Sequence, residues 1–334
     1  MECMMKTEMP VSSSNGLPVY VVVHVTEKFT VLSVLTLREA ALSVLSEGDV
    51  QRKALKTIEY VKGWCSGSIS DITNDYANSL ACPSEPSRPV SNDQMVPVVV
   101  AGLAECSDEA AKALLIEAET KKLKSMYKKN SIECTVHAIA NAESYAVDLF
   151  WDLIARYTVT SVPSADGLSS TPITLPRDFY DNMTYIANQE AEHFLSWYHR
   201  LQEMGYPFGT FPLSKGLWQS AGDTSGNLLA RLAIINLTHE AKGLDSYAYT
   251  KEKFGKAQDL KSLEVLEHNV QEEVFHVASG LRWFKYVCKE LHLEPRDQFH
   301  SLSRQYFKGK LKPPFNKEFR DQAGLTEDWY MPLT

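Results

Sequence analysis

The apolar residues of this chain recur at intervals of three and four positions over most of its length, which is the period of an amphipathic α-helix. The stretch LREAALSVL, for example, puts leucine, alanine and valine on one face, and Gly48 follows as a stop. Gly205 follows another such segment in the way that a helix C-cap does. Helices are therefore predicted over residues 36–48, 50–64, 110–129, 133–157, 177–204, 228–249 and 261–291.

Segments without this period divide the chain into parts. Residues 67–96 and 161–176 contain several prolines and are predicted to be connecting loops. Residues 1–35 are predicted to be an N-terminal extension, in which the run VYVVVHV favours a strand. Residues 295–334 are predicted to be an irregular tail that wraps over the helices to bury its aromatic side chains. Between these ends we expect an all-α fold, with an N-terminal helical region and long loop (36–132) followed by a four-helix bundle (133–294).

Two of the bundle helices carry the pattern Glu-x-x-His on their apolar side. Glu190 lies where a leucine would be expected, in a stripe of isoleucine, alanine, phenylalanine and tryptophan, and His193 lies one turn away. Glu273 and His276 repeat the arrangement among valines and a leucine. Burying an unpaired carboxylate costs several kcal/mol, so either these helices turn the acid to water or a cation lies inside the bundle.

The other two bundle helices each carry a lone acid on the apolar side. One is Glu143, in the stretch IANAESYAVDLF, and the other is Glu240, in LAIINLTHEAKGL. One Glu from each of two helices, with Glu-x-x-His from each of two more, is the ligand set of di-iron and di-manganese carboxylate bundles. Such a set can bridge two divalent ions and leave positions open for O2 or substrate. The predicted ligands are Glu143, Glu190, His193, Glu240, Glu273 and His276.

The spacing alone is a weak signal. Roughly 0.7 matches to Glu-x-x-His are expected by chance in a chain with 26 Glu and nine His. A single pair can equally be a solvated helix face or a satisfied core, so the prediction depends on all four helices together. Zinc is less suited, because H-E-x-x-H is absent. Weaker candidates, which could orient the ligands but could also be solvent-exposed or capping residues, are His137, His239, Asp245, Glu192 and Glu272. Candidates to line the pocket are Tyr145, Trp197 and Trp283.

Composition and charge exclude some classes of function. The chain has 334 residues, of which 44% are hydrophobic and 23% charged, as in an ordinary soluble globular protein. A net charge of −8 argues against general nucleic-acid binding, and the local lysines at 121–129 are interpreted as a solvated helix face. Six cysteines without a C-x-x-C pair favour a reducing compartment. No signal peptide or membrane span is predicted, so a cytoplasmic location is expected.

Several longer stretches resemble the DUF455 family of ferritin-like proteins. They include LREAALSVLSEGD, PSRPV, HAIANAESYAVDLFWD, NQEAEHF, FGTFPLSKGLWQSAGDTSGNLLARLAIINLTHEAKGLD, EEVFHVASGLRWF and PPFN, and they span residues 37–325. The resemblance implies a ferritin-like bundle with a two-metal centre at the six residues already named. The sequence departs from the family at Asn141, where relatives carry His, and at Thr210, where an acid is common.

Three functions follow from such a centre. The first is an O2-activating oxidoreductase or hydroxylase with two iron ions, or manganese, that oxidises a small-molecule or RNA-borne substrate with an external electron donor. In general style this resembles the ferritin-like tRNA hydroxylases. The second is metal storage, which needs a shell-forming oligomer and fits the long loops and extension poorly. The third is a non-enzymatic scaffold, against which the intact ligand set argues.

Overall fold

The computed structural model describes residues 35–88, 118, 121–122, 124–158, 160–163 and 170–333. The described part is almost entirely helical, so the predicted all-α class is confirmed. The predicted strand in the N-terminal extension and most of the predicted helix over 110–129 lie outside the described residues.

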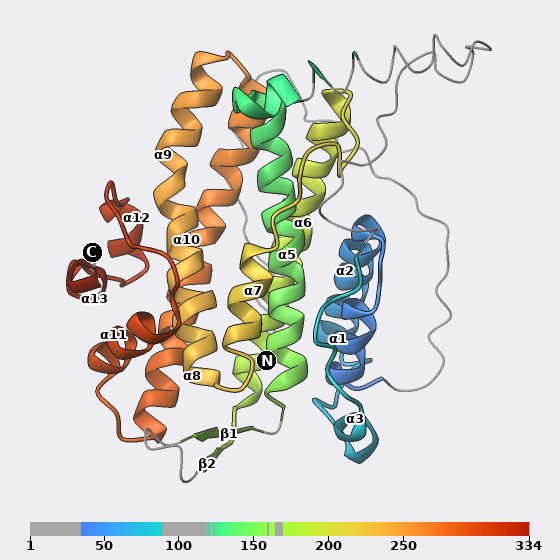
Figure 1. Cartoon of the computed structure of the whole chain (residues 1–334). Helices are drawn as coiled ribbons and strands as arrows, with labels where there is room; N and C mark the ends of the chain where they lie inside the picture. The colour runs from blue at the N-terminus through green and yellow to red at the C-terminus, as the bar shows by residue number, and fades with distance from the viewer. Residues whose placement is uncertain are drawn as a thin grey trace, which may run out of the picture.

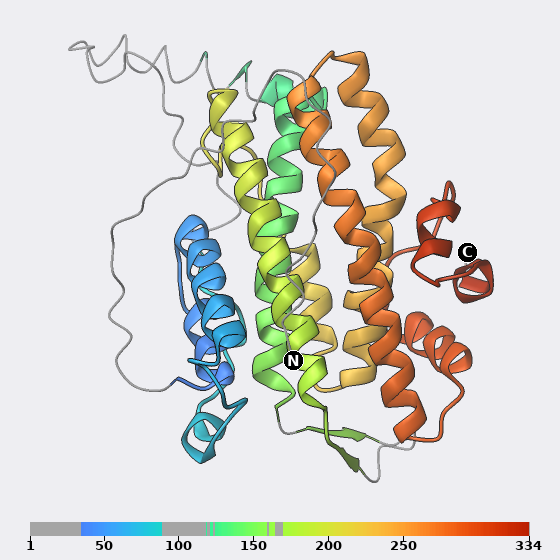
Figure 2. The ribbon, with the colours of Figure 1, turned by 180° about the vertical axis from the view of Figure 1, so that it is seen from behind.

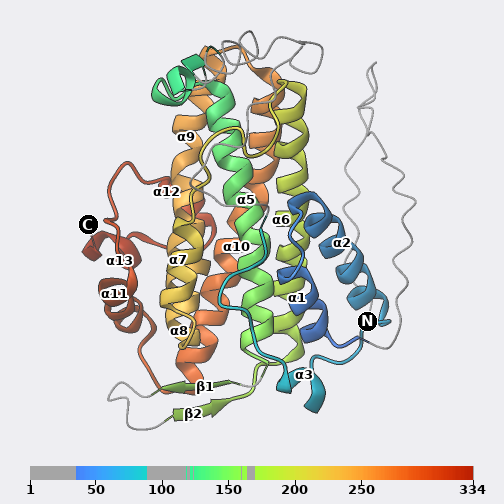
Figure 3. The ribbon, with the colours of Figure 1, turned by 45° about the vertical axis from the view of Figure 1, so that its right-hand side comes forward.

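Four long helical segments lie side by side and form the body of the molecule (Figure 1). They are α5 (Ile132–Arg156), α6 (Arg177–Glu203), α9 (Glu240–Lys256) and α10 (Leu260–Glu290). α5 packs most extensively on α6, α9 packs on α10, and α10 also packs on α6. The connection from α6 to the segment that leads into α9 runs back along the length of the bundle and contains α7 (Gly216–Asp223), as Figure 3 shows.

The segment that leads into α9 is not one regular helix, although residues 228–249 were predicted as one. It consists of α8 (Leu228–Arg231), the π-helix η2 (Leu232–His239) and then α9. Thr238 donates from its hydroxyl to the carbonyl of Ala233, five residues back, which matches the wider turn. Gly280 of α10 lies against η2 so closely that a Cβ there would meet the Asn236 carbonyl oxygen at 2.2 Å. A glycine is therefore required where α10 crosses η2.

The predicted helices near the N-terminus are confirmed to within a few residues. α1 (Leu37–Leu45) begins with a capping box between Thr36 and Glu39, and α2 (Val50–Ser66) is capped by Asp49 and ends at Gly67 in the left-handed conformation. These helices pack on α5 and α6 respectively (Figure 2). The short α3 (Asp75–Ser79) was not predicted and interrupts the expected loop.

Two expectations about irregular segments are wrong. The tail is mostly helical, with α11 (Pro295–Tyr306), α12 (Lys317–Gln322), α13 (Glu327–Tyr330) and the 3-10 helix η3 (Met331–Leu333). Pro295 occupies the first turn of α11, where a proline favours a helix. The segment between α5 and α6 forms an antiparallel hairpin of β1 (Thr160–Pro163) and β2 (Ser170–Ile173), which tolerates prolines because both strands are edges. The tail does pack on α9, α10 and η2, with Trp329 and Tyr330 buried as expected.

Candidate metal centre

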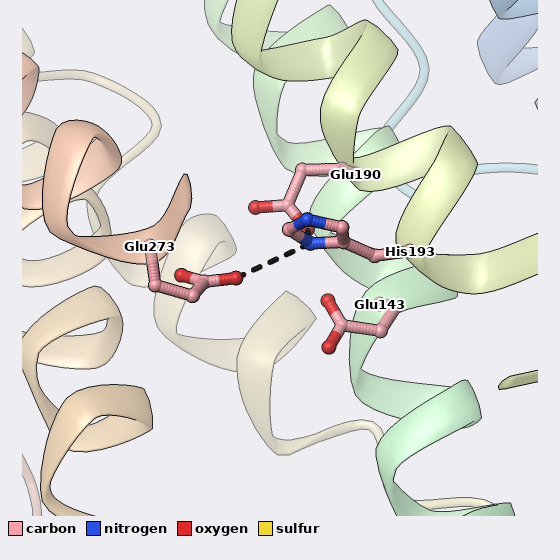
Figure 4. A group of neighbouring side chains, drawn as sticks. All are labelled: Glu143, Glu190, His193 and Glu273. Atoms are coloured by element: carbon pink, nitrogen blue, oxygen red, sulfur yellow. Dashed lines mark ion pairs between the residues drawn. The ribbon is translucent and has the colours of Figure 1, made fainter. Parts of the chain in front are cut away.

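The six predicted ligands converge in the interior of the bundle. Their ligand atoms form two groups, in each of which all the atoms lie within 4.8 Å of one another: Glu143, Glu190, His193 and Glu273 in one, and Glu190, Glu240, Glu273 and His276 in the other. Figure 4 shows the first group, with side chains from three helices pointing toward a common space. Glu190 and Glu273 belong to both groups. The arrangement thus suits two cations that share these two carboxylates.

Both histidines turn Nδ1 toward the carboxylates. His276 Nδ1 lies 3.0 Å from Glu190 Oε1 and 3.4 Å from Glu273 Oε2. His193 Nδ1 lies 3.4 Å from Glu273 Oε1 and 3.7 Å from Glu190 Oε2. None of these approaches is a hydrogen bond, and both Nδ1 atoms and Glu190 Oε2 are buried without a hydrogen-bond partner. Buried polar atoms that share a centre but not a hydrogen bond have the geometry of ligands around an ion.

The opposite ring nitrogens are held from outside the cluster. His193 Nε2 lies 2.8 Å from Glu272 Oε2, and His276 Nε2 lies 3.1 Å from Gln189 Oε1. Both oxygens accept hydrogen bonds, so each Nε2 carries the proton and donates. In the neutral imidazole this leaves a lone pair on Nδ1, which is the atom that faces the cluster. Glu272 and Gln189 therefore fix the tautomer that can bind a metal ion.

Two of the carboxyl groups have a pKa well above the ordinary value, which favours their protonated form. Burial is the main cause that raises the pKa of Glu143 well above its ordinary value, and the charges of Glu190 and Glu273 add to it. Burial likewise raises the pKa of Glu240 well above the ordinary value, followed by the charges of Glu273 and Glu190. The side chains of Glu143 and Glu240 are half-buried, whereas that of Glu190 is fully buried.

In the remaining four groups, two glutamates and two histidines favour each other's charged forms. Burial, together with Glu273, acts against the charge of Glu190, but His276 and His193 outweigh both and lower its pKa. Burial also acts against the charge of Glu273, and the same two histidines lower its pKa. In return, against the effect of burial, Glu273 and Glu190 raise the pKa of His276 to about 10. Contacts with Glu190, Glu272 and Glu273 raise the pKa of His193 well above its ordinary value, again against burial.

The donor set fits a bound metal ion. Four carboxyl groups and two imidazole rings lie together, and a divalent cation would offset the negative charge of the carboxylates. Within the described ranges, no lysine or arginine forms an ion pair with any of the six side chains. Carboxylate oxygens and imidazole nitrogens are ligands that iron and manganese accept.

A cavity of about 160 Å³ adjoins the centre. Glu143, Glu190, Glu240 and Glu273 line one part of it. Its other walls are mostly apolar: Ile139, Ala142, Ala146 and Leu149 of α5, Trp197 of α6, Leu217 of α7, and Leu266 and Val270 of α10. A molecule in this cavity would thus contact the carboxylates directly.

Most of the weaker candidates serve the fold instead. His137 Nε2 accepts from the backbone N–H of Gly209 at 2.8 Å, and Asn141 Nδ2 donates to the Ser214 carbonyl at 3.0 Å, so both tie the α6–α7 connection to α5. Asp245 pairs with Arg320 of the tail.

Five other candidates belong to the same set. Glu192 accepts from Asn188 on the same exposed helix face. His239 and Trp197 line the cavity, whereas Tyr145 and Trp283 do not. The sequence analysis missed Gln189, because its contact with His276 depends on how α6 crosses α10. The sequence shows only that Gln189 is next to Glu190, and the structure shows that it is buried.

None of the helices in the described ranges is both long and apolar enough to cross a lipid bilayer. No solved structure matches the chain. An uncharacterised protein of Haemophilus influenzae is 28% identical over 222 residues, which cover 65% of this chain and 74% of that protein. Residues 46–331 match the family described as "Protein of unknown function (DUF455)". The match covers most of the chain, and the chain therefore belongs to the DUF455 family.

Proposed function

We propose that this protein is a ferritin-like, non-haem di-iron carboxylate oxidoreductase that activates O2 to oxidise a substrate in the cavity beside the centre. The observation that carries the proposal is the pair of overlapping ligand groups, which share Glu190 and Glu273 and contain buried Nδ1 atoms without hydrogen-bond partners. A manganese–iron pair is compatible with the same oxygen and nitrogen donors.

The geometry supports a division of roles among the six ligands. Glu143 and His193 occur only in the first group, and Glu240 and His276 only in the second. Each pair would hold one ion, with Glu190 and Glu273 between the two. Such an iron pair, when bound and reduced, supplies electrons to O2 and the oxidising power for a substrate bond.

The chain's own residues would do the rest of the work by orientation and exclusion of water. Glu272 and Gln189 hold the two imidazole rings with Nδ1 inward. The apolar cavity walls keep bulk water from the carboxylates and leave room for a substrate beside them. A storage protein has no need of such a cavity next to its ligands, so the cavity favours an enzyme over storage.

The topology gives the ferritin-like assignment independent support. The bundle has one long connection, between α6 and α8, that returns along its length, as ferritin-like bundles do. The two Glu-x-x-His helices are the second and fourth of the bundle, and the single acids come from the first and third.

Metal analysis followed by an O2 reaction tests the proposal. The purified full chain is loaded anaerobically with ferrous iron, and iron content, optical absorption and O2 consumption are measured. We expect two irons per chain and O2 consumption in proportion to them, with both lost in Glu273→Gln and kept in Glu192→Gln, an exposed neighbour on α6. Hundreds of irons per assembly would instead indicate storage, and a chain that binds no metal would indicate a scaffold.

A further inference from the structure

We infer that the group oxidised at this centre is a compact hydrocarbon group, about the size of benzene, which reaches the carboxylates between α5 and α9 past Gly243. That the group is oxidised rests on the proposed function, whereas the binding of such a group follows from the cavity alone.

The size of the cavity limits its occupant. A volume of about 160 Å³ is close to that of an engineered apolar cavity of about 150 Å³ that admits benzene. An intact nucleoside or a long acyl chain is larger than this space, so only a small ring or a short branched chain can be enclosed while the rest of a larger substrate stays outside.

Apart from the four carboxyl groups of the centre, Glu143, Glu190, Glu240 and Glu273, the polar side chains of the cavity wall already have partners. The Asn269 amide bonds to the Val265 carbonyl and the Trp197 indole N–H in the orientation that satisfies both. His239 Nε2 lies 3.0 Å from the Ser220 hydroxyl.

The same holds on α9. Thr250 and Ser246 donate to carbonyls of their own helix, at Ser246 and Gly243, and Tyr247 accepts from Lys251. Among the described residues that line the cavity, Glu190 alone has a buried side-chain atom without a hydrogen-bond partner. In the part of the cavity away from the four carboxyl groups, a polar group would lose its hydrogen bonds to water and find few free partners, whereas a hydrocarbon group loses none.

The cavity opens at α9. Gly243 and Ser246 line it and are also exposed to solvent, while α7 packs on both α5 and η2 and covers the neighbouring part of this side. A Cβ at Gly243 would meet nothing within 4 Å, and the residue does not have a positive φ. Neither packing nor backbone conformation therefore requires glycine here, although glycine in a helix costs about 1 kcal/mol relative to alanine. What the glycine does provide is an unobstructed opening.

Benzene binding to the full chain tests this inference. Calorimetry with the metal-free and the iron-loaded protein would measure the affinity for benzene. We expect saturable binding of benzene and at least a tenfold loss of benzene affinity in Gly243→Phe. Gly255→Phe is the matched control, because Gly255 is exposed on the same helix, has equal space and lies off the cavity.

Ser246→Phe provides a second obstruction if Gly243→Phe does not fold, since the Ser246 hydroxyl bonds only within its own helix. Absence of saturable benzene binding, or an affinity for benzene in both obstructed variants as high as in the wild type, would overturn the inference. Benzene binding without O2 consumption by the ferrous protein would contradict the proposed function and support the apolar binding site. O2 consumption without benzene binding would support the proposed function and contradict the apolar binding site.

Discussion

Two clusters of buried charge lie along the same helix, α5, and they are neutralised in different ways. The cation-paired cluster is built on Asp148 and Asp152, whose side chains are fully buried. Asp148 accepts from Lys53 at 2.6 Å and from Arg88, and Asp152 accepts from Arg231 at 2.6 Å and from Arg156 at 2.7 Å. The ligand cluster is built on Glu143 and draws its other members from three further helices, with no lysine or arginine paired to it in the described ranges.

The difference separates structural charge from functional charge. Where the chain needs a buried carboxylate for its fold, it supplies the cation from another element, such as Lys53 from α2. Where it gathers four carboxylates and supplies none, the cation has to come from solution, as protons or as metal ions. Burial alone would not distinguish the two clusters, and neither would the presence of acidic residues.

The largest effect is expected from Asp152→Asn in the cation-paired cluster. The change leaves the buried Arg231 guanidinium facing a neutral amide, and removing one partner of a buried ion pair costs about 3–5 kcal/mol. The free energy of unfolding, measured in denaturant, should fall by this amount in both the metal-free and the metal-loaded protein. Metal content should stay at the wild-type value. A loss below about 1 kcal/mol would show that the cation-paired cluster does not support the fold.

Glu143→Gln also replaces a carboxyl group of α5 with an amide, but it should weaken metal binding and leave the stability of the metal-free protein nearly unchanged. No side chain cation is left unpaired, so the unfolding free energy of the metal-free protein should change by less than about 1 kcal/mol. The stabilisation that a bound ion adds, about 2.7 kcal/mol at free metal a hundred times Kd, should be lost for one ion. Unfolding with and without added metal measures both, and a metal-free variant as unstable as Asp152→Asn would remove the distinction between the clusters.

Glu272→Leu tests whether the ligand cluster is held from outside. Leucine offers no acceptor to the His193 Nε2–H, and loss of such an outer contact lowers metal affinity about 10–100-fold, or about 1.4–2.7 kcal/mol. Competition with a chelator measures the affinity. Glu264→Leu, an exposed change on the same helix, is the control and should leave the affinity unaltered. Equal affinity in both variants would mean that Glu272 does not orient the ring.

The sequence predicts the ligand cluster better than the cation-paired one for a physical reason. Glu190 and His193 are a turn apart on one helix, so helical periodicity alone puts them on one face, and apolar neighbours show that the face is buried. Lys53 and Asp148 are 95 residues apart, and their pairing depends on how α2 lies against the bundle. A local pattern carries no information on that crossing.

The same reasoning explains the errors in the fold. The helical tail was missed because prolines were taken to exclude helices, although Pro295 in the first turn of α11 favours one. The π-helix before Glu240 was missed because an apolar run such as LAIINL fits a regular helix equally well. Its wider turn is recognisable only beside Gly280, where the backbones of α10 and η2 meet.

His137 is a buried histidine outside both clusters, and the pH dependence of stability that it causes is the smallest effect expected. Burial alone lowers its pKa to about 4, whereas His276 among the ligand carboxylates has a pKa of about 10. Because the folded pKa of His137 lies below the unfolded value of about 6.5, the unfolded chain binds more protons between these values. The stability that depends on neutral His137 is therefore complete above about pH 6.5 and is lost as pH falls toward 4.

From pH 7 to 5.5 this loss should amount to about 1 kcal/mol, because the neutral ring must keep accepting from the Gly209 N–H. His137→Gln retains an acceptor but does not titrate, so its unfolding free energy should fall less than that of the wild type over this interval. Denaturant unfolding of the two metal-free proteins at both pH values gives the difference directly, since the ligand cluster is common to both and cancels. Equal slopes would mean that His137 has the same pKa in the folded and the unfolded chain, and burial without a counter-charge would then fail to explain how the two kinds of buried histidine differ.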